Sequence, residues 1–206
     1  MYQLYTIPAS CSTGIHALLN TFEASFEVIN REDVPEYQSL VPTNQVPALQ
    51  DKEQLITEGA AIVLHLLDKH NVNLETLGGA NQFRQWLMFN YATLHPAYSK
   101  LFTISKQLED SPIKQAVMEK LALQVSELWK IIDKKLEGNT FMMGDTPTII
   151  DYLLAVYLNW GNFFTNVNIP VGKNVLKLVE RVSTLPEFVK AYETEGAQHS
   201  IPLTAH

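Results

Sequence analysis

The chain has 206 residues, of which 46% are hydrophobic and 18% are charged, and its formal net charge is −7. This length is enough for a substantial core, and no apolar run approaches the roughly 20 residues of a membrane-spanning helix. The acidic balance excludes a general nucleic-acid binder, because affinity for phosphate needs clustered Lys and Arg. The start "MYQLYTIPASCS" does not have the pattern of a secretion signal, and a lone cysteine suits a reducing compartment. We therefore expect a cytoplasmic protein without a membrane segment.

The first 70 residues change pattern quickly. Alternating and helical periodicities predict a strand at "YQLYTI", a helix at "STGIHALLNTFEA" and a second strand at "SFEVIN". After a connecting segment that includes a second-helix region, "QVPALQ" and "EQLI" predict a hairpin, and "TEGAAIVLHLLDKH" predicts a helix. The order β-α-β-α-β-β-α is that of a thioredoxin-like domain, which we place at residues 1–72.

Strand signals stop at the polar, glycine-bearing stretch "NVNLETLGGAN", and long helical periodicities follow. We place a linker at residues 73–80 and an all-helical domain at residues 81–206. Within "GDTPTIID", Thr148 and Asp151 have the spacing of a capping box. The expected helices cover residues 81–108, 112–136, 148–164, 172–182 and 186–196.

Cys11 is the only cysteine, and it lies at the predicted junction of the first strand and first helix. Free backbone N–H groups and the helix dipole favour an anion there, so we expect a thiolate with a lowered pKa. The alternative is a buried cysteine that packs as a small hydrophobe. Gly14 occupies the second thiol position of a C-x-x-C motif, which excludes an intramolecular dithiol cycle but allows exchange with an external thiol.

"NQVPAL" places Pro47 just before a strand of the predicted sheet. We hypothesise a cis Val46–Pro47 bond that turns the backbone N–H and C=O of Val46 outward, toward an extended peptide-like ligand. An ordinary trans proline that opens a strand is the alternative.

"TEG" opens the third predicted helix of the first domain. The first N–H groups of this helix, at Gly59, could hold a carboxylate, while Glu58 offers a negative charge to an amino group. The same pair could instead be a helix start with a favourable acidic residue.

Taken in order, these motifs resemble those of the glutathione transferases, in particular the bacterial beta class, over essentially the whole chain. The segments that carry the resemblance are "ASCSTGIH", "NQVPAL", "TEGAAIVLHLLD", "RQWLMFNYATLH", "GDTPTIIDYLLAVYLNW" and "LPEFVKAYETEGA". The resemblance implies a thioredoxin-like domain that binds glutathione, a helical domain that lines a hydrophobic co-substrate cleft, a homodimer, and no metal.

The resemblance also implies roles for single residues. Val46 would bond the cysteinyl part of glutathione, Glu58 its α-amino group and the N–H of Gly59 its γ-glutamyl carboxylate. Cys11 would lie against the glutathione sulfur. His95, at the end of "YATLH", looks like a beta-class histidine that reaches the site from the helical domain.

Two features depart from the beta-class pattern. Pro96 stands where a lysine is expected after His95, and a proline inside a helix should kink it near Ala92. The family also places a basic residue in the second-helix region. That segment is shorter than usual here, and Arg31 is the nearest candidate.

The expected function is conjugation of reduced glutathione to small hydrophobic electrophiles, with the thiolate stabilised by Cys11, Ser10 or Ser12. Thiol–disulfide exchange through Cys11 is a second chemistry that the resemblance implies. The alternatives are a non-enzymatic interaction protein of the same fold, or a zeta-like glutathione-dependent isomerase suggested by "SCS". Aromatic residues of the helical domain are expected to be mostly core, with no more than two or three in the cleft, on the helices of Tyr98 and Trp160.

Overall fold

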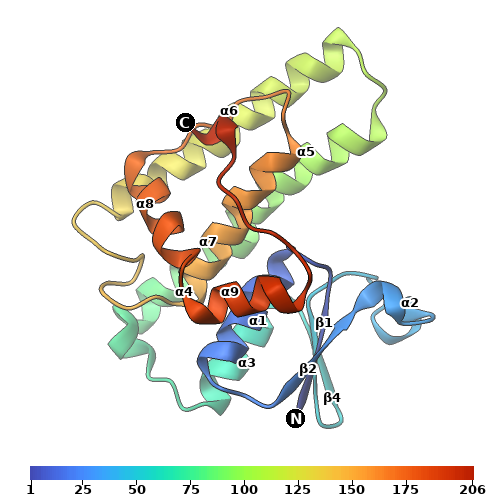
Figure 1. Cartoon of the computed structure of the whole chain (residues 1–206), viewed down its shortest axis with the longest axis vertical. Coiled ribbons are helices and arrows are strands. Elements are labelled where there is room, and N and C mark those ends of the chain that lie inside the picture. Colours follow the sequence, from blue (N-terminus) through green and yellow to red (C-terminus); the bar gives the residue numbers. More distant parts are fainter.

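The computed structural model describes all residues from 1 to 206 and shows a mixed sheet and its helices beside a larger helical part (Figure 1). The sheet has the strand order β2-β1-β3-β4. β1 runs parallel to β2, while β3 is antiparallel to both β1 and β4. The strands are β1 (Tyr2–Thr6), β2 (Phe26–Asn30), β3 (Ala48–Asp51) and β4 (Gln54–Thr57).

Three α-helices lie in the same part of the chain as the sheet: α1 (Cys11–Thr21), α2 (Tyr37–Leu40) and α3 (Gly59–Lys69). A 3-10 turn, η1 (Arg31–Asp33), precedes α2. Figure 1 shows α1 and α3 together on one side of the sheet and α2 on the other. The order β-α-β-α-β-β-α and the thioredoxin-like fold are confirmed.

The helical part begins after the 3-10 helix η2 (Leu74–Leu77), which lies in the stretch expected to be a linker. Its longest helices, α5 and α6, form the hairpin at the top of Figure 1. Each expected helical region is helical, with the ends moved by a few residues. The elements are α4 (Ala80–Phe89), η3 (Asn90–Leu94), α5 (His95–Gln107), α6 (Pro112–Lys135), α7 (Ile149–Asn159), η4 (Trp160–Phe163), α8 (Lys173–Val182), α9 (Pro186–Thr194) and η5 (Leu203–Ala205). No helix is both long and apolar enough to cross a membrane.

The region expected as one helix over residues 81–108 is interrupted by η3, a π-helical turn. The N–H of His95 bonds the carbonyl of Asn90, five residues earlier, in place of the usual four. Pro96 follows at once and has no N–H to continue the α-helical pattern. Ala92, near which a kink was expected, therefore lies in a π turn.

The capping box at α7 is confirmed. The Asp151 carboxylate accepts hydrogen bonds from the N–H of Thr148 at 2.8 Å and from the N–H of Met142 at 2.8 Å. Every residue of α7 is buried, because this helix runs through the middle of the molecule. The capping box thus fixes the start of the central helix.

The two parts of the chain share one continuous cluster of buried side chains. α1 packs on α7 so closely that a Cβ atom at Gly14 would lie 2.9 Å from Leu153 Cδ2. α9 covers α1 as well, and Asn20 donates a hydrogen bond to the carbonyl of Glu187 at 3.0 Å. The helix that starts with Cys11 is therefore enclosed by the helical part.

Candidate functional site

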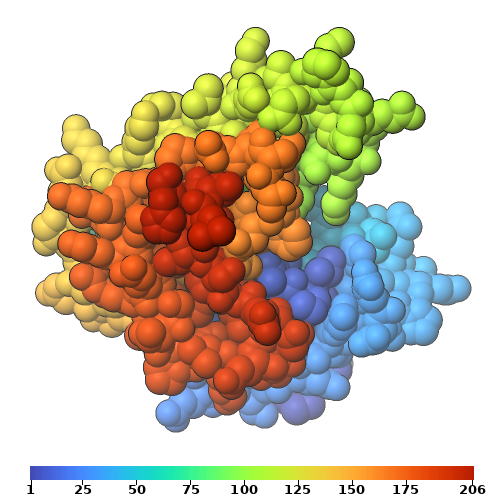
Figure 2. Space-filling view, turned by 45° about the horizontal axis from the view of Figure 1, so that its top comes forward, coloured from blue at the N-terminus to red at the C-terminus, as the bar shows by residue number.

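A cavity of about 220 Å³ lies where the thioredoxin-like part meets the helical part. In Figure 2 the surface is notched between the blue and cyan half of the molecule and the green and orange helices. The cavity wall contains Cys11, the backbone around Val46 and Pro47, and the start of α3. α5 and η3 complete it with two aromatic side chains, His95 and Tyr91. Segments distant in the sequence thus form a single cavity.

The Val46–Pro47 peptide bond is cis, as hypothesised. The carbonyl of Val46 faces Cys11, with its oxygen 3.8 Å from Sγ. The N–H of Val46 makes no backbone hydrogen bond within the protein. This N–H is the donor that an extended ligand could use.

Cys11 begins α1 and is 5% exposed. Burial raises the pKa of the Cys11 thiol to about 12, although hydrogen bonds from the N–H groups of Cys11 and Ser12 act in the opposite direction. The expectation of a lowered pKa was wrong, because the loss of solvation outweighs the helix start. Cys11 is a neutral thiol at physiological pH.

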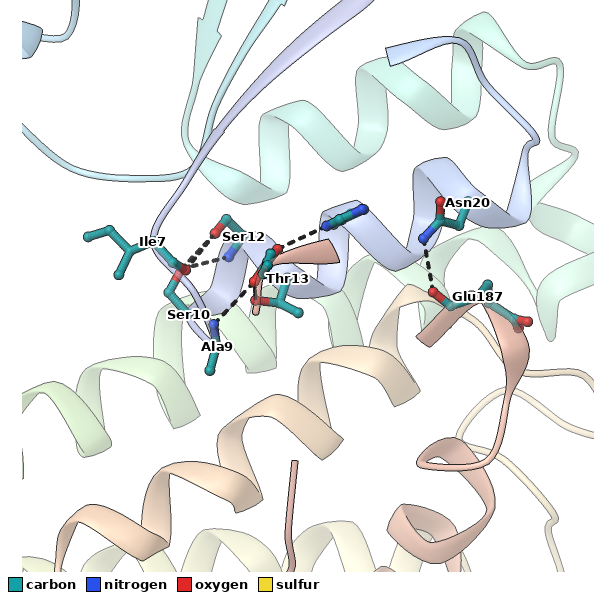
Figure 3. Close-up of polar contacts among 9 residues, drawn as sticks. Ile7, Ala9, Ser10, Ser12, Thr13, Asn20 and Glu187 are labelled. Atoms are coloured by element: carbon teal, nitrogen blue, oxygen red, sulfur yellow. Dashed lines mark hydrogen bonds and ion pairs between the residues drawn. The ribbon is translucent and has the colours of Figure 1, made fainter. Parts of the chain in front are cut away.

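Ser10 and Ser12 point to each other and lie outside the cavity wall. Ser10 is the N-cap of α1, and its oxygen accepts from the N–H of Ser12. The two hydroxyl oxygens are 2.6 Å apart, and that of Ser12 also reaches the carbonyl of Ile7 at 3.4 Å (Figure 3). Both serines make hydrogen bonds at the start of α1, and neither faces the site where the glutathione sulfur was expected.

The start of α3 has no side chain that caps it. Glu58, the N-cap residue, has φ 66° and ψ 109°, a conformation that costs of order 1–3 kcal/mol for a residue other than glycine. Its side chain is exposed, while Gly59 is buried beneath Tyr91. The first N–H groups of α3 remain available to an anion.

His95 stands at the start of α5, and its ring packs edge-on against Tyr157 and Trp160 at centroid distances of 5.7 and 5.3 Å. Its Nδ1 lies 3.3 Å from the hydroxyl oxygen of Ser99. Burial lowers the pKa of the imidazole below its usual value. The ring is therefore neutral at physiological pH, and it is a weaker base than a solvated imidazole.

Arg31 is not brought into the cavity wall. Its guanidinium donates to the carbonyl of Asn44 at 2.7 Å. Asn44 immediately precedes the cavity residue Gln45, so Arg31 supports the loop that leads to the cis bond.

The sequence did not predict Tyr91 as a cavity residue, nor the hydrogen bonds by which the helical part holds the loop before Cys11. The signal for Tyr91 is its position four residues before His95, which places both on one helix face. Tyr98, on a helix expected to reach the cleft, is instead fully buried and accepts from Trp129 Nε1 at 2.9 Å.

The loop before Cys11 is held by two side chains of the helical part. Trp160 Nε1 donates to the carbonyl of Ala9 at 2.8 Å. The Glu195 carboxylate accepts from the N–H of Ala9 at 3.2 Å and from the hydroxyl of Thr13 at 2.7 Å. Ala9 has φ 56°, and these contacts on both sides of the residue hold it in that conformation.

Two family models match this chain, and together they cover most of it. "Glutathione S-transferase, N-terminal domain" matches residues 1–68, and "Glutathione S-transferase, C-terminal domain" matches residues 92–186. The chain belongs to the glutathione S-transferase family. The thioredoxin-like and helical parts are therefore the two domains of a glutathione S-transferase fold.

Similar proteins carry the same family name. Glutathione S-transferase GST-4.5 of Xanthomonas campestris is 31% identical over 170 residues, which cover 78% of this chain and 82% of that protein. Glutathione S-transferase GstA of Escherichia coli O157:H7 is 26% identical over 206 residues, covering 94% and 98%. The solved glutathione S-transferase from Xylella fastidiosa has a TM-score of 0.84 and 24% identity, covering 96% and 100%. The last likeness supports the shared fold.

Proposed function

We propose that this member of the family conjugates reduced glutathione to small hydrophobic electrophiles. The observation that carries the proposal is the cavity that places Cys11, the unpaired N–H of Val46 and the uncapped start of α3 along one wall. The thiol of Cys11, the free N–H of Val46 and the anion site at α3 match the sulfur, the cysteinyl backbone and the γ-glutamyl carboxylate of a γ-glutamyl peptide thiol. The names of the relatives support the same activity.

In the proposed complex, residues 1–72 hold glutathione and residues 81–206 complete the cleft. The N–H of Val46 donates to the cysteinyl part of the peptide. Glu58 receives the α-amino group, and the N–H of Gly59 receives the γ-glutamyl carboxylate. The glutathione sulfur then lies against Cys11.

In the proposed chemistry Cys11 is a hydrogen-bond donor and His95 is a proton acceptor. Because its pKa is about 12, the Cys11 S–H donates a hydrogen bond to the glutathione thiolate and favours that thiolate over its thiol. The neutral imidazole of His95 accepts the proton that glutathione loses. The thiolate then attacks the electrophile, and orientation in the cavity lowers the barrier.

A side activity in disulfide exchange follows if Cys11 itself loses its proton to His95. The Cys11 thiolate would attack a mixed disulfide of glutathione and release the other thiol. A second glutathione would then attack the Cys11–glutathione disulfide, forming oxidised glutathione and restoring Cys11. This route carries the cost of ionising a buried thiol, so we expect it to be the slower one.

The electrophile would bind along a path of aromatic rings that starts at His95. The Trp160 ring lies 5.3 Å from His95 and 5.8 Å from Phe102. Phe102 in turn lies 5.6 Å from Phe163, which is 63% exposed. Such a series favours flat, apolar substrates.

We further propose that the protein is a cytoplasmic homodimer, because it belongs to this family.

The test compares wild type with Cys11→Ala, His95→Ala and the control His65→Ala, whose ring binds Asp51 away from the cavity. Conjugation of an aromatic halide and glutathione-dependent disulfide reduction are measured for each. We expect Cys11→Ala to abolish reduction and spare much of the conjugation, and His95→Ala to slow conjugation about 10- to 100-fold. Equal loss in both assays for Cys11→Ala would overturn this separation of roles.

Thermal unfolding with and without millimolar reduced glutathione tests the interaction-protein alternative. A ligand that binds the native state must raise the melting temperature. An unchanged melting temperature would refute glutathione binding and favour the interaction protein. Isomerisation of an unsaturated diketo acid, in place of conjugation, would favour the zeta-like enzyme.

A further inference from the structure

The hydroxyl of Tyr91 is buried and has no hydrogen-bond partner. An unpaired buried hydroxyl costs about 1–3 kcal/mol. Seven buried side-chain N or O atoms of this chain lack a partner, and the Tyr91 hydroxyl is the one that belongs to a residue of the cavity wall. Tyr91 lies in η3, the π-helical turn of the helical domain, and its ring forms part of the cavity wall. A polar atom therefore stands without a partner beside the proposed glutathione site.

The position of this hydroxyl is defined by Gly59, the first residue of α3. A Cβ atom at Gly59 would lie 2.6 Å from the Tyr91 oxygen, so the phenol occupies the space that a side chain would fill. The ring reaches this place across the domain boundary because Gly59 has no side chain. The hydroxyl thus lies at the helix start where an anion is favoured.

Three features of the α3 start are independent of one another. The helix has 11 residues and no side-chain cap, so its first N–H groups lack partners. The Tyr91 hydroxyl adds a donor from another domain. The Glu58 side chain is exposed beside them and suits an ammonium group. Together they fit the α-amino and α-carboxylate groups of one amino acid.

We infer that the Tyr91 hydroxyl donates a hydrogen bond to the carboxylate bound at the start of α3. The inference rests on the proposed function, and it makes Tyr91 the residue of the helical domain that recognises the γ-glutamyl end of glutathione. Tyr91 acts here as a binding and specificity residue and takes no part in the chemical step.

The surroundings of Tyr91 suit a donor. Burial raises the pKa of the phenol well above its usual value, so the hydroxyl keeps its proton throughout the physiological range. A hydrogen bond to a carboxylate is stronger than one between neutral groups, and shielding from water strengthens it further. Tyr91 lies in the π turn and His95 directly follows it, and both side chains line the same cavity.

The first test compares Tyr91→Phe with Tyr192→Phe. Tyr192 is the matched control, because its hydroxyl is also buried without a partner but lies on α9. Glutathione affinity is measured by calorimetry, and kcat and KM by conjugation. We expect Tyr91→Phe to weaken glutathione binding about tenfold or more, with kcat nearly unchanged, and Tyr192→Phe to leave both constants unchanged.

The second test uses 4-aminobutyryl-cysteinyl-glycine, a glutathione analogue that lacks the α-carboxylate of the γ-glutamyl residue. Wild type and Tyr91→Phe should bind it with equal affinity, because the bond that the variant lost has no acceptor in this peptide. If Tyr91→Phe lowers the affinity for glutathione and for the analogue by the same factor, Tyr91 acts through packing and the inference is wrong.

A relocation variant keeps the inference testable if loss of the phenol disturbs the fold. Tyr91→Ala makes room at Gly59, and Gly59→Ser in the same chain returns a hydroxyl to the start of α3. We expect the double variant to bind glutathione more tightly than Tyr91→Ala alone. No gain would count against a hydroxyl contact. If wild type itself fails to bind glutathione, the proposed function falls with the inference. If wild type binds glutathione and Tyr91→Phe binds it equally well, the inference falls alone.

Discussion

Glu195, just after α9, forms a buried hydrogen bond with His16 of α1, with 2.9 Å between Oε1 and Nδ1. Each side chain is 1% exposed. The other carboxylate oxygen accepts from Thr13 and from the N–H of Ala9. One carboxylate thus satisfies three donors, on α1 and in the loop that leads to Cys11. The C-terminal domain thereby fixes the backbone of the glutathione-binding domain.

Glu195→Ala should lower the free energy of unfolding by about 3–5 kcal/mol, because it leaves His16 and Thr13 buried without their acceptor. Urea unfolding followed by circular dichroism measures the change. The control is Glu193→Ala on the exposed side of α9, which we expect to stay within about 0.5 kcal/mol of wild type. A loss of the same size in both variants would contradict a specific role for Glu195.

Trp160→Phe should keep most of the aromatic packing but lose the hydrogen bond from Nε1 to the carbonyl of Ala9. We expect about 1 kcal/mol less stability and a higher KM for glutathione, because the Cys11 loop loses one of its anchors. Thermal unfolding and conjugation kinetics check the two effects. Trp129→Phe is a control, since its Nε1 bonds Tyr98 within the helical core, and it should lower stability without raising KM.

Asp151→Ala should destabilise the protein by about 2–4 kcal/mol, because the N-terminus of α7 loses its capping box and the N–H of Met142 loses its partner. Asp151→Asn keeps one acceptor oxygen and should recover part of the loss. Chemical denaturation of the three proteins tests this order. Equal stability of the Ala and Asn variants would show that packing, rather than hydrogen bonding, holds this position.

The alkylation rate of Cys11 should keep rising with pH. With a pKa of about 12, the thiolate fraction increases about tenfold for each pH unit between 7 and 9.5, without a plateau. Iodoacetamide labelling followed by mass spectrometry measures the rate. A plateau below pH 9 would mean that the helix start, and not burial, controls the thiol. A small-molecule thiol labelled in parallel supplies the reference curve.

Local sequence patterns predicted the elements because each is determined by nearby residues. The strand of "YQLYTI" and the helix beginning at Thr148 follow from periodicity and capping, which act within a few residues. The pKa of Cys11 could not be predicted this way, since it depends on burial, and α1 is covered by α7 and α9 from far along the chain. The hydrogen bond from Arg31 to the carbonyl of Asn44 could not be predicted either, because it joins two segments that only the folded chain brings together.

The sequence alone determined the fold class, the family resemblance, and the segments that meet at the cavity, because motif order and hydrophobic period are properties of the chain itself. The tertiary structure decided which side chains face that cavity. It turned Ser10 and Ser12 toward each other, raised the pKa of Cys11, and brought Tyr91 onto Gly59. These outcomes depend on desolvation and on contacts between residues far apart in sequence, which no local pattern records.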